Sequence, residues 1–78
     1  MLVLREQFNA SYLLPAWRAV LTPREQAVGA AIARGWDNRT VAGELGCTLA
    51  TVKKHLQNIF DKVGVDSRAA FVARASGR

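Results

Sequence analysis

The chain has 78 residues, which is room for one domain, and its 11 Lys and Arg against six Asp and Glu give a formal net charge of +5. A single cysteine excludes an intrachain disulfide, and the presence of only one cysteine and one histidine in the chain argues against a zinc site. The basic balance favours a polyanionic partner, either nucleic acid or an acidic membrane surface, but solubility alone explains the same charge, so the positions of the charges must decide.

Residues 1–20 are expected to be an N-terminal extension or linker, ahead of a helical unit over residues 21–78. Two interpretations stay open for it: an ordered linker, or a short extra helix that docks on the core or extends a dimer interface. Three apolar residues recur at helical spacing before the pattern breaks at Pro15, and these are Leu4, Phe8 and Tyr12. The residues expected to pack beneath the following helices are Trp17, Val20 and Leu21.

The first clear helix is predicted over residues 23–34. Thr22 is a good N-cap, Pro23 suits the first helical position, and Glu25 completes a capping box with Thr22. Gly35 is typical of the residue that ends a helix. The apolar stripe of this helix consists of Val28, Ala31 and Ile32.

Two further helices follow, joined by a tight connection over residues 46–48. The shorter one is predicted to start after the cap Asp37 and to end at Gly46. The longer one, over residues 49–63, starts after the cap Thr48 and carries the strongest amphipathic pattern in the chain. Its apolar face consists of Val52, Leu56, Ile59, Phe60 and Val63.

A fourth helix is predicted after a turn near residue 65, with Asp66 or Ser67 as its cap. No alternating strand pattern competes with the four helices. We therefore expect an all-α fold, a compact four-helix bundle with an N-terminal extension. The apolar residues of the last helix are Ala69, Ala70, Phe71, Val72 and Ala75.

The outward face of the third helix carries the strongest functional signal. Opposite its apolar face stand Lys53, Lys54 and Gln57. Lysine can donate to guanine O6 and N7, glutamine can pair with adenine, and lysine also neutralises phosphates. The short helix and tight turn before it complete the geometry of a helix-turn-helix, whose second helix enters the major groove of DNA. The alternative is a merely solvated helix face, which two outward lysines do not exclude.

The run from Leu21 to Ala75 resembles the LuxR/FixJ-type (GerE-like) helix-turn-helix domain of bacterial transcription regulators. It covers about 55 of the 78 residues, and the whole series of matches is specific although no single piece is decisive. The matching pieces are Leu21-Thr22-Pro23-Arg24-Glu25, then Gly35, Asn38-Arg39, Val41-Ala42 and Leu45-Gly46, then Thr51-Val52-Lys53-Lys54-His55-Leu56 with Ile59-Phe60, and Lys62-Val63-Gly64-Val65-Asp66-Ser67-Arg68-Ala69.

The resemblance implies that the helix over residues 49–63 lies in the major groove of double-stranded DNA. The residues at positions that match its base contacts are Lys53, Lys54 and Gln57. Those expected at phosphates, where hydroxyls, amides and helix N-termini suit an anion, are Thr48, Thr51, Asn38, Arg39 and Asn58. The last helix resembles one that often forms a dimer contact, and the interface residues expected there are Ala69, Phe71, Val72 and Ala75.

Three departures from the family pattern mean that the operator need not match that of any relative. Trp36-Asp37 stands where a small or apolar residue and Ser are usual, and Arg39-Thr40 stands where Lys and an acidic residue are commoner. Gly29 replaces a bulkier helical residue. It costs up to ~1 kcal/mol relative to Ala and is a candidate for close helix packing.

The remaining reactive side chains are interpreted structurally. Glu25 shares the apolar stripe of the first helix and needs a cation, for which Arg68 is the predicted partner in a structural pair. Cys47 is interpreted as a small packed residue, with a redox switch as the alternative. His55 is interpreted as a packed or capping residue, with a pH sensor or a DNA contact as the alternative. No catalytic constellation, metal site or Gly-rich phosphate loop can be assembled, so we expect no enzyme and no cofactor.

We therefore expect a sequence-specific transcription regulator that binds double-stranded DNA as a homodimer, at half-sites about 10 bp apart. Control is expected from an upstream sensor or receiver domain or from a partner regulator. Two rivals stay open: a protein-interaction module that blocks another regulator, and a sigma-factor-like promoter contact. The sequence does not give the operator, the regulated genes, the signal, or the choice between activation and repression.

No run of residues approaches the ~20 apolar residues of a transmembrane helix, and the start of the chain lacks the pattern of a signal peptide. We therefore expect no membrane partner and a cytoplasmic location, where a lone thiol stays reduced. The sequence leaves open whether Met1 is the natural start.

Overall fold

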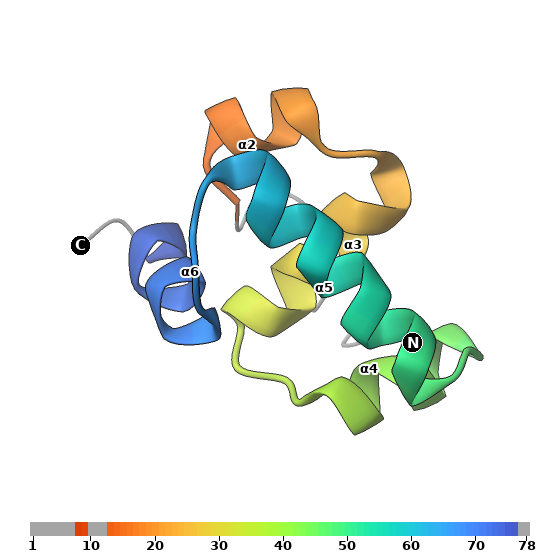
Figure 1. Cartoon of the computed structure of the whole chain (residues 1–78). Coiled ribbons are helices and arrows are strands. Elements are labelled where there is room, and N and C mark those ends of the chain that lie inside the picture. The colour runs from red at the N-terminus through yellow and green to blue at the C-terminus, as the bar shows by residue number, and fades with distance from the viewer. Residues whose placement is uncertain (1–7, 10–12, 77–78) are drawn as a thin grey trace.

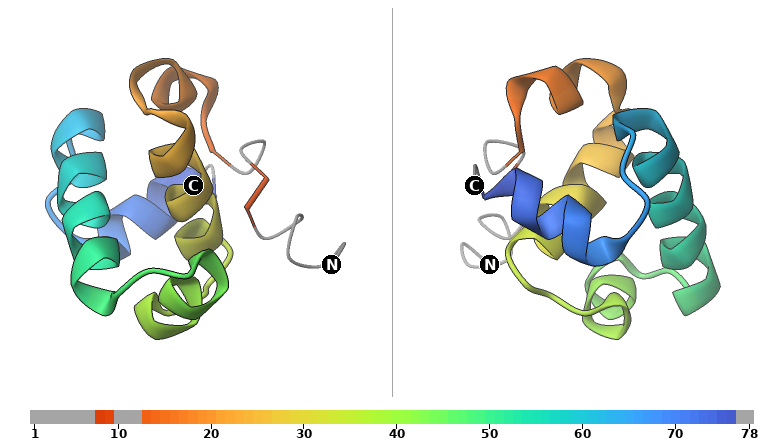
Figure 2. Two further views of the ribbon diagram at one scale, coloured as in Figure 1. Left: turned by 90° about the vertical axis from the view of Figure 1, so that its right-hand side faces the viewer. Right: turned by 60° about the vertical axis from the view of Figure 1, so that its left-hand side comes forward.

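The computed structural model describes residues 8–9 and 13–76, and this part of the chain contains five helices and no strand. The helices are α2 (Pro15–Val20), α3 (Pro23–Ala33), α4 (Asn38–Leu45), α5 (Leu49–Val63) and α6 (Arg68–Ala75). Helix α3 packs against α5, with α2 at one end of this pair and α4 at the other (Figure 1 and Figure 2). Helix α6 closes the remaining side of α3. The predicted all-α bundle is confirmed.

The start of α3 is fixed by the predicted capping box. The Thr22 hydroxyl oxygen accepts a hydrogen bond from the Glu25 N–H at 3.1 Å, and the Glu25 carboxylate accepts one from the Thr22 N–H at 2.9 Å. These two bonds satisfy backbone donors that a helix start otherwise leaves without partners. The helix ends where predicted, since Gly35 adopts a φ of +97° that L side chains rarely take.

The next three helices begin at capping residues that the sequence identifies. The side chains of Asp37 and Thr48 accept hydrogen bonds from the third backbone N–H of α4 and α5. Of the two candidates for the cap of α6, Ser67 is the one used, because its hydroxyl accepts from the Ala70 N–H at 3.0 Å. Each cap contributes about 1 kcal/mol to helix stability, which matters for helices as short as α4 and α6.

The described part of the N-terminal segment contains a helix, α2, which begins at Pro15, whereas the helical spacing noted before Pro15 falls mostly outside the described residues. Proline suits the first helical position because it has no N–H group to leave unsatisfied there. Pro15, which interrupts the apolar spacing of the residues before it, therefore begins α2. Trp17 and Leu21 pack into the core as predicted, whereas the prediction for Val20 is wrong, because 51% of its surface is exposed. The predictions for Leu4 and Tyr12 fall outside the described residues.

The core is built around Phe71 of α6, which is fully buried. Its ring stacks on Trp17 of α2 at a centroid distance of 4.8 Å and lies 5.4 Å from the ring of Phe60 in α5. A side chain at Gly29 would begin 3.4 Å from the Phe71 ring, so this glycine allows α6 to approach α3 closely. The prediction that Phe71 belongs to a dimer interface is therefore wrong. The buried apolar residues are Leu13, Trp17, Leu21, Val28, Ala30, Ala31, Ile32, Val41, Ala42, Val52, Leu56, Ile59 and Phe71.

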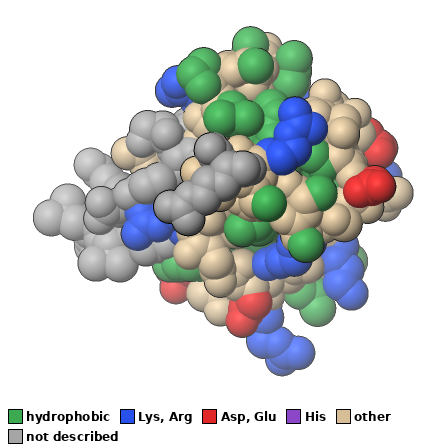
Figure 3. All heavy atoms as spheres, turned by 90° about the vertical axis from the view of Figure 1, so that its left-hand side faces the viewer, with side chains coloured by type: hydrophobic (Ala, Val, Ile, Leu, Met, Phe, Trp, Pro, Cys, Tyr) green, Lys and Arg blue, Asp and Glu red, His purple; other side chains and the backbone are tan. Residues whose placement is uncertain are grey.

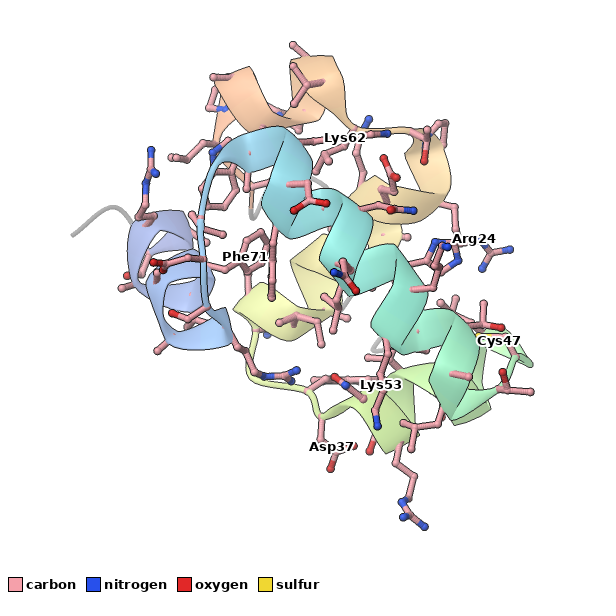
Figure 4. All side chains as sticks on the ribbon, viewed as in Figure 1. Arg24, Asp37, Cys47, Lys53, Lys62 and Phe71 are labelled. Carbon is pink, nitrogen blue, oxygen red and sulfur yellow. The ribbon has the colours of Figure 1, made fainter. Side chains whose placement is uncertain are left out.

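The predicted pair of Glu25 with Arg68 is also wrong, because the cation beside Glu25 is Lys62. The Lys62 Nζ atom donates to the Glu25 carboxylate at 2.7 Å and joins the start of α3 to the last turn of α5 (Figure 4). Arg68 instead begins α6 next to the start of α4, where it binds other partners. The need of Glu25 for a cation was predicted correctly, and only the identity of the cation differs.

The ionisation of Glu25 reflects two opposing effects. Burial raises the pKa of this carboxyl, but hydrogen bonds from Lys62 and from the Thr22 N–H, together with the charge of Lys62, outweigh it and hold the pKa below its ordinary value. The carboxylate is therefore the favoured form in the folded chain. Protonation of Glu25 weakens both the capping box and the link between α3 and α5.

Substitution Glu25→Gln tests this ion pair, because glutamine keeps the capping geometry and removes the charge. We expect the free energy of unfolding at pH 7 to fall by about 1 kcal/mol, a modest value because the Lys62 side chain is 39% exposed. The folded pKa of Glu25 lies below the ordinary value of 4.5, so the unfolded chain binds more protons in acid. The wild type should thus lose this stability as the pH falls below about 4.5, and the variant should lose less.

The matched control is Lys62→Gln, alone and combined with Glu25→Gln, with urea unfolding followed by circular dichroism at pH 7 and pH 4. Coupled side chains give a double variant less destabilised than the sum of the single variants. Additive effects at both pH values would show that the two side chains do not interact.

Candidate nucleic-acid interface

Helix α5 is buried on one face and open on the other. Val52 and Ile59 are fully buried, and the three predicted base-contact residues are exposed on the outward side. Because a helix pinned by one apolar face cannot rotate, these side chains are held away from the core. The exposed residues brought together in this way are Lys53, Lys54 and Gln57.

The turn before α5 sets the angle at which this helix leaves α4. Gly46 takes a φ of +69°, and the Cys47 N–H donates to the Ala42 carbonyl at 3.0 Å. The Thr48 hydroxyl oxygen accepts from the Thr51 N–H at 3.1 Å, and the hydroxyl oxygens of these two threonines lie 3.0 Å apart. Both threonines are exposed, Thr48 as the N-cap and Thr51 in the first turn of α5, where the remaining N–H groups and the helix dipole suit an anion.

The start of α4 carries two more of the predicted phosphate contacts. Asp37 caps this helix with a 2.7 Å bond from the Thr40 N–H, and hydrogen bonds from the backbone and side chain of Thr40 hold the pKa of Asp37 below its usual range. Arg39 is exposed, while Asn38 is half-buried and accepts a 2.6 Å hydrogen bond from Arg68. Its amide NH₂ group is the remaining donor.

Arg68 fastens the start of α6 to the start of α4. Its guanidinium donates to the Asn38 side chain at 2.6 Å and to the Trp36 carbonyl at 2.8 Å. The planar guanidinium holds its N–H donors in a fixed fork, so that one rigid side chain binds both acceptors in a defined geometry. Sequence reasoning missed this role because the two partners lie about 30 residues upstream, beyond the reach of any local pattern.

Two hollows flank α5. One, of about 400 Å³, lies on the side of Lys53 and Gln57 and includes the carboxylates of Asp61 and Asp66. The other, of about 280 Å³, lies on the side of the helix-turn-helix turn and has no carboxylate in its lining. The first is lined by Asn38, Lys53, Leu56, Gln57, Phe60, Asp61, Val65, Asp66 and Arg68. The second is lined by Arg24, Leu45, Gly46, Cys47, Thr51 and His55.

The other predicted site residues are spread more widely. Asn58 is half-buried one turn beyond Lys54 in α5, and Ala69 is exposed on α6. Val72 and Ala75 are half-buried and pack partly against the core. Sequence reasoning gave no role to Arg24, because the fold rather than any local pattern places it beside Thr51.

Within the described residues, no group of three or more His, Cys, Asp and Glu side chains is placed to hold a metal ion. The half-buried thiol of Cys47 is free and shares the smaller hollow with His55. None of the helices described has the length and apolar character needed to cross a membrane.

Comparison with known proteins agrees with this architecture. The family described as bacterial regulatory proteins, luxR family, matches residues 19–75. A probable transcriptional regulatory protein SgaR of Hyphomicrobium methylovorum is 49% identical over 53 residues, which are 68% of this chain and 25% of that protein. A monoamine regulon transcriptional regulator of Klebsiella aerogenes is 39% identical over 56 residues, which are 72% of this chain and 25% of that protein. No solved structure matches the chain significantly.

The chain thus spans about a quarter of the length of these curated relatives. The match includes the capping box of α3, the turn at Gly46 and the whole of α5. The resemblance on which the sequence-based predictions relied is confirmed: the chain belongs to the luxR family of bacterial regulatory proteins.

Proposed function

We propose that the chain binds double-stranded DNA in a sequence-specific manner to regulate transcription, with α5 in the major groove. The observation that carries this proposal is the grouping of Lys53, Lys54 and Gln57 on the outward face of a helix whose opposite face is buried. An α-helix fits a major groove about 12 Å wide, so the outward face is the one that meets the base edges.

Each of the three side chains has chemistry suited to that position. Gln57 can pair with the N6 and N7 atoms of adenine, and Lys53 or Lys54 can donate to guanine O6 and N7. The outward lysines also neutralise phosphates, which gives affinity that does not depend on sequence. Thr48 and Thr51 at the start of α5, with Arg39 in α4, are proposed to position the helix by binding phosphate oxygens.

We propose that the chain binds as a homodimer through the outer face of α6. Ala69 is exposed there and Val72 is half-buried, so that two copies could pack small side chains against each other. Figure 3 shows the side of the molecule on which α6 lies, where hydrophobic and basic side chains are interspersed. The buried Phe71 stabilises α6 from inside and takes no part in this contact.

Control of binding is proposed to come from a sensor or receiver domain, in the same chain or in a partner regulator. The support is that the two relatives are named as regulators and that this chain matches about a quarter of each. A cytoplasmic location follows from a role on chromosomal DNA and stays part of the proposal.

The double substitution Lys53→Ala/Lys54→Ala tests the groove assignment. We expect affinity for duplex DNA to fall by about 100-fold at ~100 mM salt, because two phosphate or base contacts are lost. The measurement is fluorescence anisotropy of a labelled duplex, enriched from a random pool with the wild type, over a range of salt concentrations.

The matched control removes the same charge outside α5 and α6, through Arg18→Ala/Arg34→Ala at two exposed arginines. Urea unfolding of both variants establishes that each is folded under the titration conditions. Equal losses of DNA affinity in the two double variants would show that the effect arises from net charge alone. Absence of any duplex affinity in the wild type at low salt would reject DNA binding and favour a protein-interaction module.

Substitution Ala69→Glu tests the dimer contact, because it places a carboxylate on the exposed face of α6. We expect sedimentation velocity to show two wild-type chains on one enriched duplex and a single chain of the variant at the same concentration. Ala16→Glu on the exposed side of α2 is the control and should keep the wild-type stoichiometry. Two chains of Ala69→Glu per duplex would contradict a dimer through α6.

A further inference from the structure

The smaller hollow beside α5 has the character of an anion site. It is formed where the first turn of α3 meets the helix-turn-helix turn, and it holds about 280 Å³. Arg24 contributes the cation, and the Thr51 hydroxyl and the His55 imidazole are polar groups that can donate hydrogen bonds. No carboxylate lines this hollow, in contrast to the larger one, which contains Asp61 and Asp66.

The position of the hollow relative to the outward face of α5 is equally informative. At about 100° per residue, Thr51 and His55 lie on one side of the helix and Lys53 on the other, with Lys54 between them. Arg24 and Lys53 are seen on opposite sides of α5 (Figure 4). A helix seated in the major groove has one DNA backbone along each side, so the hollow faces one of the two strands.

The Arg24 side chain is available for such a ligand. It is exposed, and within the described part of the chain it has no hydrogen-bond or ion-pair partner. The neighbouring carboxylate of Glu25 is occupied by Lys62, and the arginine on the other side of α5, Arg68, is held by Asn38 and Trp36. The two sides of α5 therefore differ. On one side Arg68 is hydrogen-bonded within the protein and the hollow contains carboxylates, whereas on the other side, among the described residues, Arg24 has no such partner and the hollow contains no carboxylate.

We propose that Arg24, Thr51 and His55 form a binding site for a backbone phosphate of the DNA strand that borders this side of α5. The guanidinium fork binds two phosphate oxygens, and the Thr51 hydroxyl or the His55 imidazole donates to one of them. Such a phosphate contact fixes the position of α5 along the groove and does not itself distinguish one base sequence from another. This inference rests on the proposed DNA binding and adds an anchor from α3, outside the helix-turn-helix.

The test compares Arg24→Gln, Arg24→Lys and the charge-matched control Arg18→Gln with the wild type. Anisotropy titrations of the full chain with a labelled duplex are run over a range of salt concentrations, at a temperature where circular dichroism shows every variant to be folded. Relative to Arg18→Gln, Arg24→Gln should bind about 3- to 10-fold more weakly. The slope of log K against log salt, which is negative, should become less steep by about 0.9. Arg24→Lys should restore the slope, because it keeps the charge, and part of the affinity.

The outcomes separate the site from the function on which it rests. A wild type that binds, with Arg24→Gln and Arg18→Gln giving the same slope and affinity, overturns the phosphate site and leaves DNA binding intact. Loss of affinity in Arg24→Gln without a change in slope also overturns it, since no phosphate contact is then lost. A wild type that does not bind duplex DNA at low salt overturns both proposals.

Discussion

The one-sided burial of α5 is the constraint on which the rest of the structure depends. Val52, Leu56 and Ile59 are packed between α3 and α4, and this fixes the rotation of α5 about its own axis. A rotation of about 100°, one residue along the helix, would bury a lysine and expose a core residue, at a cost of several kcal/mol. The positions of Lys53 and Lys54 are therefore a consequence of packing on the opposite face.

A chain this small has little apolar surface with which to hold α5 in place, and the structure compensates in two ways. Gly29 lets the ring of Phe71 reach the body of α3, and Trp17 stacks on that ring from α2. The Glu25–Lys62 ion pair then joins the two long helices at the end where α2 packs. The segment before residue 21 thus contributes to the same core as the helices behind the candidate interface.

The features predicted from sequence are those set within one helical turn. The cap Thr48, the capping box of Thr22 with Glu25 and the stop at Gly46 each depend on residues three or four positions apart, and all are as predicted. Partners distant in sequence were missed: Lys62 lies 37 residues from Glu25, and only the packing of α3 on α5 brings them together.

The prediction that Phe71 faces outward was wrong for a related reason. Apolar residues occur all round α6, so periodicity could not show which of them faces the core. Val20 was misassigned because Pro15 starts a helix and so changes the side on which later residues lie. The position of Arg24 was not predicted because Thr51 and His55, which line the same hollow, belong to a different helix. The outward face of α5 could be predicted from sequence, whereas the residues that line the hollows on its two sides could not.

The central claim, that the outward face of α5 meets DNA, is tested most directly by NMR. Amide chemical shifts of the ¹⁵N-labelled chain are followed while a duplex enriched from a random pool is added. The account predicts that the largest changes lie between Thr48 and Asn58 and around Arg24, with small changes in the core of α3. Changes confined to α2 or α6, or no change at low salt, would contradict it.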